Sequence, residues 1–192
     1  MYKLEYMING CDGRVPMTSK EIDVREYIRS IPDWPKKGIL FRDITPLLAN
    51  SEAFAAAVDT LCADFAEAGV EYVAAVEARG FIFGAAVAKK LGTGFVPIRK
   101  KGKLPGQTES ITYDLEYGTD TLEVHYDAVK NGAKVLMVDD LLATGGTMAA
   151  ACKLIEKIAG QVVGIVFLIE LTDLGGREKI NDYKITSIIT YE

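Results

Sequence analysis

Two adjacent aspartates and the small-residue segment that follows them are the part of this 192-residue chain best suited to chemistry. Asp139 and Asp140 come directly after the apolar run 135–138, and the segment 143–147 reads Ala-Thr-Gly-Gly-Thr. At a turn between a buried strand and a helix, unpaired backbone N–H groups and the helix dipole converge on one point, which favours a phosphate. Carboxylates beside that point can accept hydrogen bonds from vicinal hydroxyls. The pattern therefore predicts a site for a ribose 5-phosphate.

Two common phosphate-binding loops do not account for this segment. It lacks the Gly-Lys-Ser/Thr ending of a P-loop and the three-glycine spacing of a dinucleotide-binding turn. The alternative is that Asp139 and Asp140 only end a strand and that the glycines only make a turn. We favour ligand binding because the apolar run, the paired acids and the Thr-Gly-Gly-Thr segment each meet a separate requirement of a sugar phosphate.

The whole stretch 135–147 resembles the signature with which type I phosphoribosyltransferases bind phosphoribosyl pyrophosphate (PRPP). The resemblance implies an α/β fold: a parallel sheet flanked by helices, with a small N-terminal hood and a flexible lid loop. It implies that Asp139 and Asp140 hold the ribose hydroxyls. It implies that the 5′-phosphate is bound by Ala143, Thr144, Gly145, Gly146 and Thr147. Mg²⁺ would arrive with PRPP rather than bind directly in a protein cage.

A second group of residues could bind another anion. Glu77-Ala78-Arg79-Gly80 follows a predicted strand and opens a predicted helix, so its backbone and the Arg79 guanidinium could hold a phosphate. A surface arginine at a helix start is the alternative. The family has its pyrophosphate loop at this position, often with serine where this chain has Ala78. The resemblance also implies pyrophosphate contacts, within one chain or across a dimer interface, from Arg99, Lys100 and Lys103, which without it would be read as a solvated basic face.

The polar segment 99–118 is about twenty residues long, which suggests a lid over the site. The resemblance assigns Glu116 to the catalytic position, where it could accept or share a proton with a purine as N9 attacks. It places Tyr113 and Tyr117 in the lid beside it. His125, the only histidine, follows the lid on a predicted strand or strand edge and is interpreted as structural.

The identity of the base depends on two other segments. Leu40, Phe41 and Arg42 resemble the adenine pocket of the family's adenine-specific members, and Leu171 would pack on the other face of the purine. The implied reaction converts adenine and PRPP to AMP and pyrophosphate, as in purine salvage. Ordinary core packing is the alternative for Leu40, Phe41 and Leu171. A phosphoribosyltransferase for hypoxanthine, xanthine or orotate, and a PRPP-sensing regulator without catalysis, are the competing functions.

The remaining patterns describe the scaffold. A capping box at Thr18 and Glu21 predicts a helix over 19–30, and a second helix is predicted over 51–69. Apolar runs at 72–76, 95–98, 134–138 and 162–169 predict strands, with helices at 81–91 and 148–158. Such alternation predicts an α/β fold with a mostly parallel sheet. We divide the chain into a poorly ordered extension, 1–17, and a single domain, 18–192, with a hood at 33–50 and a lid at 99–118.

Composition limits the partners and the compartment. The net charge of -5 and the pI of about 5.1 argue against nucleic acid or an anionic membrane as a partner. The three cysteines have no paired spacing, which favours a reducing cytoplasm. No segment reaches membrane-spanning length. The family resemblance implies a homodimer that acts on small molecules, adenine and PRPP.

Overall fold

The computed structural model describes residues 22–114 and 118–192. Its strands are β1 (Arg29–Ile31), β2 (Phe41–Asp43), β3 (Tyr72–Val76), β4 (Gly94–Lys100), β5 (Thr108–Asp114), β6 (Thr119–His125), β7 (Lys134–Leu142), β8 (Gln161–Leu171) and β9 (Ile185–Tyr191). Its helices are α1 (Thr45–Ala49), α2 (Ser51–Ala63), α3 (Gly80–Leu91) and α4 (Gly146–Lys157), with short 3-10 segments η1 (Val24–Tyr27), η2 (Thr172–Leu174) and η3 (Gly176–Ile180). The extension 1–17 and the capping-box residues Thr18 and Glu21 lie outside the described residues.

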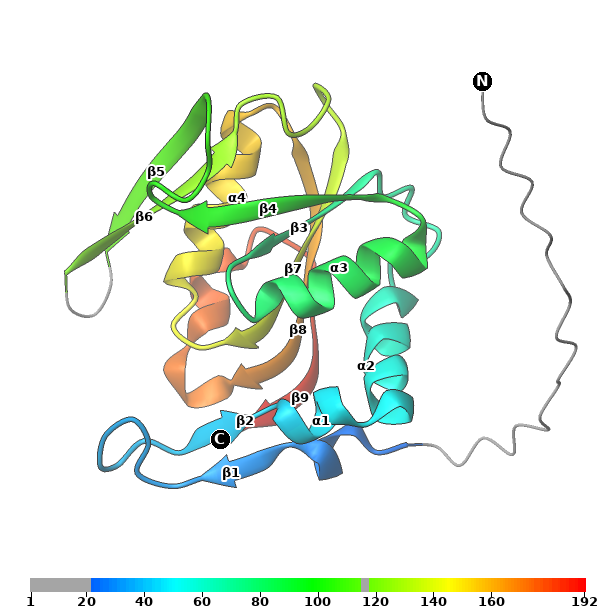
Figure 1. Cartoon of the computed structure of the whole chain (residues 1–192), viewed down its shortest axis with the longest axis vertical. Helices are drawn as coiled ribbons and strands as arrows, with labels where there is room; N and C mark the ends of the chain where they lie inside the picture. The colour runs from blue at the N-terminus through cyan, green and yellow to red at the C-terminus, as the bar shows by residue number, and fades with distance from the viewer. Residues whose placement is uncertain (1–21, 115–117) are drawn as a thin grey trace, which may run out of the picture.

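A seven-stranded sheet in the order β5-β6-β4-β3-β7-β8-β9 forms the centre of the molecule (Figure 1). From β4 to β9 all neighbouring strands are parallel, whereas β6 pairs antiparallel with β4 and β5 pairs antiparallel with β6. Strands β3 and β4 are joined through α3, and β7 and β8 through α4, as the alternation of apolar runs and helical stretches predicts. The predicted α/β fold is confirmed. Because parallel strands end at the same edge, the segments after β3, β4 and β7 come together there.

Two hydrophobic clusters, one on each face of the sheet, hold these layers together. Strand β7 contributes side chains to both clusters. Leu136 and Val138 belong to the cluster with α2 and α3, whereas Val135 and Met137 belong to the cluster with α4. All four side chains are fully buried. This explains why the runs are apolar on both faces instead of alternating with polar residues.

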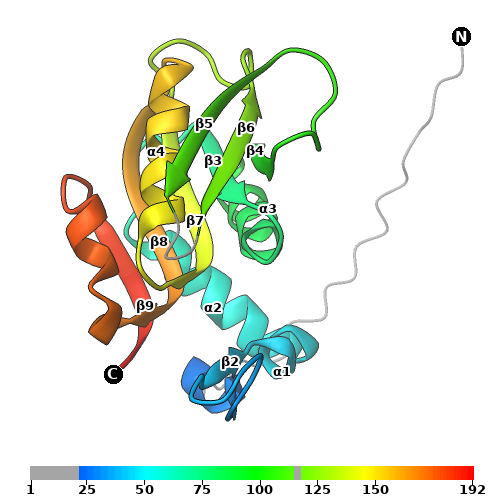
Figure 2. The same cartoon turned by 90° about the vertical axis from the view of Figure 1, so that its left-hand side faces the viewer.

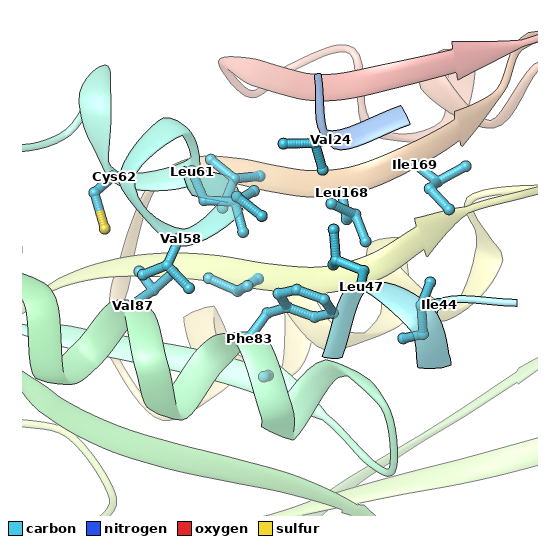
Figure 3. Close-up of a cluster of buried hydrophobic side chains, with 14 of the residues drawn as sticks. Val24, Ile44, Leu47, Val58, Leu61, Cys62, Phe83, Val87, Leu168 and Ile169 are labelled. Atoms are coloured by element: carbon cyan, nitrogen blue, oxygen red, sulfur yellow. The ribbon is translucent and has the colours of Figure 1, made fainter. Parts of the chain in front are cut away.

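The N-terminal segments are anchored in the first cluster (Figure 3). Val24, Ile44 and Leu47 pack beside Leu61 of α2 and Leu168 of β8, and all are buried. Cys62 lies in the same cluster as a buried free thiol, and burial raises its pKa, as suits the predicted core role.

Two predicted helices differ from the structure. In the described part of the first, η1 covers only four residues and is followed by β1, which pairs with β2 in a separate two-stranded sheet. Tertiary contacts override the helical spacing here, because Arg29 forms an ion pair with the buried carboxylate of Asp43 across that sheet. The second helix begins as predicted, with the Asn50 side chain capping the N–H groups of Glu52 and Ala53, but ends at Ala63 and continues as turns to Gly69.

The segment 99–118, predicted as a polar lid loop, contains the first strand of a β-hairpin, β5. Strands β5 and β6 pair from Thr108↔His125 to Asp114↔Thr119, and Figure 2 shows the hairpin lying along α4. Ile111 and Tyr113 alternate with polar residues and pack against the second cluster, a period-two signal that the sequence prediction missed. His125 ends β6, as predicted, and its Nε2 lies 2.8 Å from the Pro105 carbonyl oxygen. No helix within 22–114 and 118–192 is long and apolar enough to cross a bilayer.

Candidate active site

A small cavity lies where β7 passes into α4. It measures about 80 Å³ and is lined by residues 141–148, which include the predicted phosphate segment. A water molecule occupies about 30 Å³ of liquid, so the cavity can hold a larger group. The amino end of the twelve-residue helix α4 opens at Gly146, which adds the positive end of its dipole. A larger depression of about 490 Å³ lies near Val24 and Ile188 and is not lined by any residue of the predicted phosphate segment.

The backbone of the segment 143–147, the predicted phosphate loop, lies against η3. Gly145 has φ +76°, and a Cβ atom there would lie 2.2 Å from the carbonyl oxygen of Gly176. A Cβ at Gly176 would lie 2.1 Å from the carbonyl oxygen of Ala143. The second glycine of the Thr-Gly-Gly-Thr segment therefore begins the helix, whereas the first permits close packing that no side chain would allow.

The two acids lie within β7 instead of following it, because the strand continues to Leu142 rather than ending at 138. Asp139 Oδ1 accepts a hydrogen bond from the Asp140 N–H at 2.9 Å. Burial raises the pKa of Asp139, and the neighbouring charge of Asp140 raises it further. Burial also raises the pKa of Asp140, although Arg79 opposes the shift. The pair is therefore costly to ionise unless donors reach it.

Asp140 shows where such donors are needed. Its Oδ2 is buried and has no hydrogen bond of good geometry from any residue that the structure describes, although Arg79 Nη2 lies 2.9 Å away as an ion pair. Buried acceptors are normally satisfied, so this oxygen, which has an ion pair but no hydrogen bond within the described residues, can accept one from a ligand group. Ribose hydroxyls have the required chemistry.

Arg79 joins the acids to the hood. The segment 77–79 follows β3 and leads into α3, as predicted, and the Glu77 N–H donates to the Ile98 carbonyl at 3.0 Å. Besides its contact with Asp140, the Arg79 guanidinium lies over the Phe41 ring at 5.4 Å. A candidate ribose contact, a candidate pyrophosphate contact and a candidate base contact are thereby brought together from three distant segments.

The other predicted pyrophosphate residues fall into two groups. Arg99 and Lys103 both contact the carboxylate of Glu77, with Lys103 Nζ at 2.7 Å from Oε2 and Arg99 Nε at 3.3 Å from Oε1. Lys100 points elsewhere, because its Nζ lies 3.0 Å from Asp120 on β6 and that partner raises the lysine pKa. The structure thus places Arg99 and Lys103, but not the Lys100 amine, beside the segment that carries Arg79.

The predicted base residues lie between the hood and the last strand. Leu40 is exposed, whereas Phe41 is partly buried and packs edge-on against Trp34 with ring centroids 4.4 Å apart. The side chain of Arg42 contacts other residues of the protein. Its guanidinium lies 3.6 Å from the centre of the Tyr191 ring and donates a hydrogen bond to Ser30 Oγ at 2.6 Å. Leu171 is the register partner of Tyr191 between β8 and β9. Sequence reasoning missed Tyr191, because only the fold brings the chain's penultimate residue to the hood.

The hairpin approaches the phosphate loop through Tyr113, whose hydroxyl lies 3.2 Å from Thr147 Oγ1. Lys157 of α4 fixes the side of the hairpin by an ion pair of 2.8 Å to Glu109 and a hydrogen bond to the Ser110 carbonyl. Glu116 and Tyr117, the predicted catalytic and lid residues, lie outside the described residues, between the ends of β5 and β6.

The site thus combines a glycine-rich turn after a parallel strand with two acids before it and an arginine-bearing loop beside it, the arrangement predicted for a phosphoribosyl transferase domain. A family model with that description matches residues 47–192. Adenine phosphoribosyltransferases are similar over most of the chain: that of Pseudothermotoga lettingae is 53% identical over 170 residues, covering 88% of this chain and all of the relative. That of Cereibacter sphaeroides is 58% identical over 164 residues, covering 85% and 91%. The chain belongs to the adenine phosphoribosyltransferase family.

Solved structures agree with this assignment. The adenine phosphoribosyltransferase of Thermoanaerobacter pseudethanolicus has a TM-score of 0.83 at 54% identity and covers 88% of this chain and 98% of its own. That of Saccharomyces cerevisiae, solved with adenine and an imino-altritol bisphosphate, has a TM-score of 0.82 at 38% identity and covers 86% and 96%.

Proposed function

We propose that the protein transfers the 5-phosphoribosyl group of PRPP to N9 of adenine, giving AMP and pyrophosphate. The observation that carries the proposal is the buried Asp140 oxygen, which has an ion pair with Arg79 but no hydrogen bond from the described residues. Asp140 directly precedes the segment 141–148 that lines the small cavity, and Arg79 also lies over the Phe41 ring of the hood. The names of relatives more than half identical over most of the chain support adenine as the base.

Each part of the site has a task in this reaction. Amides of the loop 143–147 hold the 5′-phosphate, and Asp139 and Asp140 accept hydrogen bonds from the ribose hydroxyls. The bond from C1′ to the pyrophosphate oxygen breaks, and a bond from C1′ to N9 forms. Positive charge from Arg79, Arg99 and Lys103 stabilises the departing pyrophosphate. The proton released by the purine passes to Glu116.

The base would lie between the hood and the end of β8. Phe41 and Leu171 offer apolar surface to the two faces of a purine, and the Leu40 backbone offers hydrogen-bonding groups to its edge. Because Arg42 is held by Tyr191 and Ser30, its backbone rather than its guanidinium is the part available to the base. Closure of the hairpin would exclude water from the cation-like transition state.

Mg²⁺ is part of this proposal. The hard carboxylate oxygens of Asp139 and Asp140 suit either sugar hydroxyls or a magnesium ion that already carries water and phosphate ligands. When bound with PRPP, Mg²⁺ would supply charge neutralisation at the pyrophosphate. We also infer a homodimer, which light scattering can test, and a cytoplasmic location, with which the buried free thiols Cys62 and Cys152 agree.

A base panel tests the proposed function. Purified protein, PRPP and Mg²⁺ are incubated with adenine, hypoxanthine, guanine or xanthine, and nucleotide and pyrophosphate are quantified. The expected result is AMP and pyrophosphate in equal amounts, with the other bases far slower. Preferential use of another base would overturn the choice of adenine. PRPP binding without product from any base would favour a PRPP-sensing regulator.

A further inference from the structure

Glu77 is a buried carboxylate that several cationic and amide donors approach. Its side chain is only 7% exposed. The Lys100 backbone N–H donates to Oε1 at 2.6 Å, Lys103 Nζ to Oε2 at 2.7 Å, and Arg99 Nε and Nη2 lie at 3.3 and 3.4 Å from the two oxygens. One carboxylate thereby organises the end of β4 and the turn that follows.

The location of Glu77 links two predicted anion-binding segments. It lies two residues before Arg79, which contacts Asp140, and its own N–H is bonded to β4. Another buried carboxylate, Glu123, accepts a hydrogen bond from the Gly102 N–H at 2.9 Å and fixes the same turn from the other side. The basic turn is therefore held by carboxylates at both ends.

The carboxylate of Glu77 is the common partner of two cations. The guanidinium of Arg99 and the ammonium of Lys103 both contact it. Burial by itself raises the pKa of Glu77, but hydrogen bonds from Lys103, the Lys100 amide and Arg99 outweigh it and lower the pKa from 4.5 to about 2. The carboxylate is therefore ionised throughout the neutral range.

We propose that Glu77 is a positioning residue that holds Arg99 and Lys103 in the arrangement required to bind the pyrophosphate group of PRPP. The inference rests on the proposed function. Long basic side chains lose much rotamer freedom on binding an anion, and prior fixation by Glu77 lowers that cost. A carboxylate that served only to neutralise the two cations would have the opposite effect, because its removal would strengthen anion binding.

Glu77→Gln separates the two roles, because it keeps the shape and one oxygen but removes the charge. Binding of pyrophosphate with Mg²⁺ and of ribose 5-phosphate is measured by titration calorimetry. Charge-assisted hydrogen bonds have net values that correspond to about ten- to hundredfold in affinity, so we expect pyrophosphate binding to weaken by about that factor. Ribose 5-phosphate, which lacks pyrophosphate, should bind as in the parent.

Two further variants complete the experiment. Glu77→Asp keeps the charge on a shorter side chain and should bind pyrophosphate with intermediate affinity. Asp59→Asn is the control, because it also removes a carboxylate from an ion pair, the one of 2.9 Å with Lys90 between α2 and α3. It should leave the affinities for both ligands unchanged.

The outcomes are distinct. Pyrophosphate binding by Glu77→Gln that equals or exceeds the parent's, or an equal loss for both ligands, would overturn the inference. If Glu77→Gln does not fold, parent-like pyrophosphate affinity of Glu77→Asp would overturn it instead. Failure of the parent protein itself to bind pyrophosphate would overturn the proposed function and this inference with it.

Discussion

Substitution of Gly145 by alanine should disturb the phosphate loop in two separable ways. The residue has φ +76°, a conformation that costs an L-residue roughly 1–2 kcal/mol. The new Cβ would also lie 2.2 Å from the Gly176 carbonyl oxygen, so that one backbone segment must move. Overpacking of this kind typically costs about 1–3 kcal/mol. We therefore expect Gly145→Ala to lower the free energy of unfolding by about 2–5 kcal/mol.

The displaced loop should also bind PRPP less well. A shift of about 1 Å in a positioning segment can cost on the order of a hundredfold in rate, so kcat/KM for PRPP should fall by about that factor. Urea unfolding gives the stability change, and initial rates at varied PRPP with saturating adenine give the kinetic change.

Gly132→Ala is the matched control. Gly132 has φ +74°, but a Cβ there would have no atom within 4 Å among the described residues. This variant should lose only the roughly 1–2 kcal/mol of backbone strain and keep its kinetics. If Gly145→Ala and Gly132→Ala lost the same stability and both kept parent kinetics with PRPP, the packing of the loop on Gly176 would not position the phosphate site, and the reasoning would be refuted.

Two further variants address the acids. Glu116→Ala should fold and bind PRPP but lose most of its turnover, as steady-state rates and PRPP titration can show; parent-level turnover would exclude Glu116 as the catalytic residue. For Asp139, burial raises the pKa above its usual 3.8, so the stability of the parent falls as the pH rises from about 3.8 through the raised pKa. The melting temperature of Asp139→Asn should accordingly exceed that of the parent at pH 7, and the difference should be smaller at pH 4. Equal differences in melting temperature at the two pH values would contradict the raised pKa of Asp139.

The sequence by itself was enough to predict the parallel strands β3, β4, β7 and β8 and the turn that leads from β7 into α4. Buried parallel strands are short, apolar on both faces and followed by helices, so the runs at 72–76 and 134–138 identify β3 and β7 without any knowledge of their partners. The sequence signal for the loop after β7 is equally local, because the acid pair, the two glycines and the start of the helix all lie within a dozen residues. The alternation of Ile111 and Tyr113 was also present in the sequence, but the glycine- and proline-rich start of the segment concealed it.

Tertiary structure alone decided which distant groups meet at the site. Helical spacing near Val24 gave way to β1 because pairing with β2 and the Arg29–Asp43 ion pair stabilise the extended form. Arg42 contacts Tyr191, and Glu77 gathers Arg99 and Lys103, across separations of 149 and of 22 to 26 residues. No local pattern encodes such contacts, because hydrophobic periodicity reports only which face of an element is buried. Which charges face one another is settled by strand order and register.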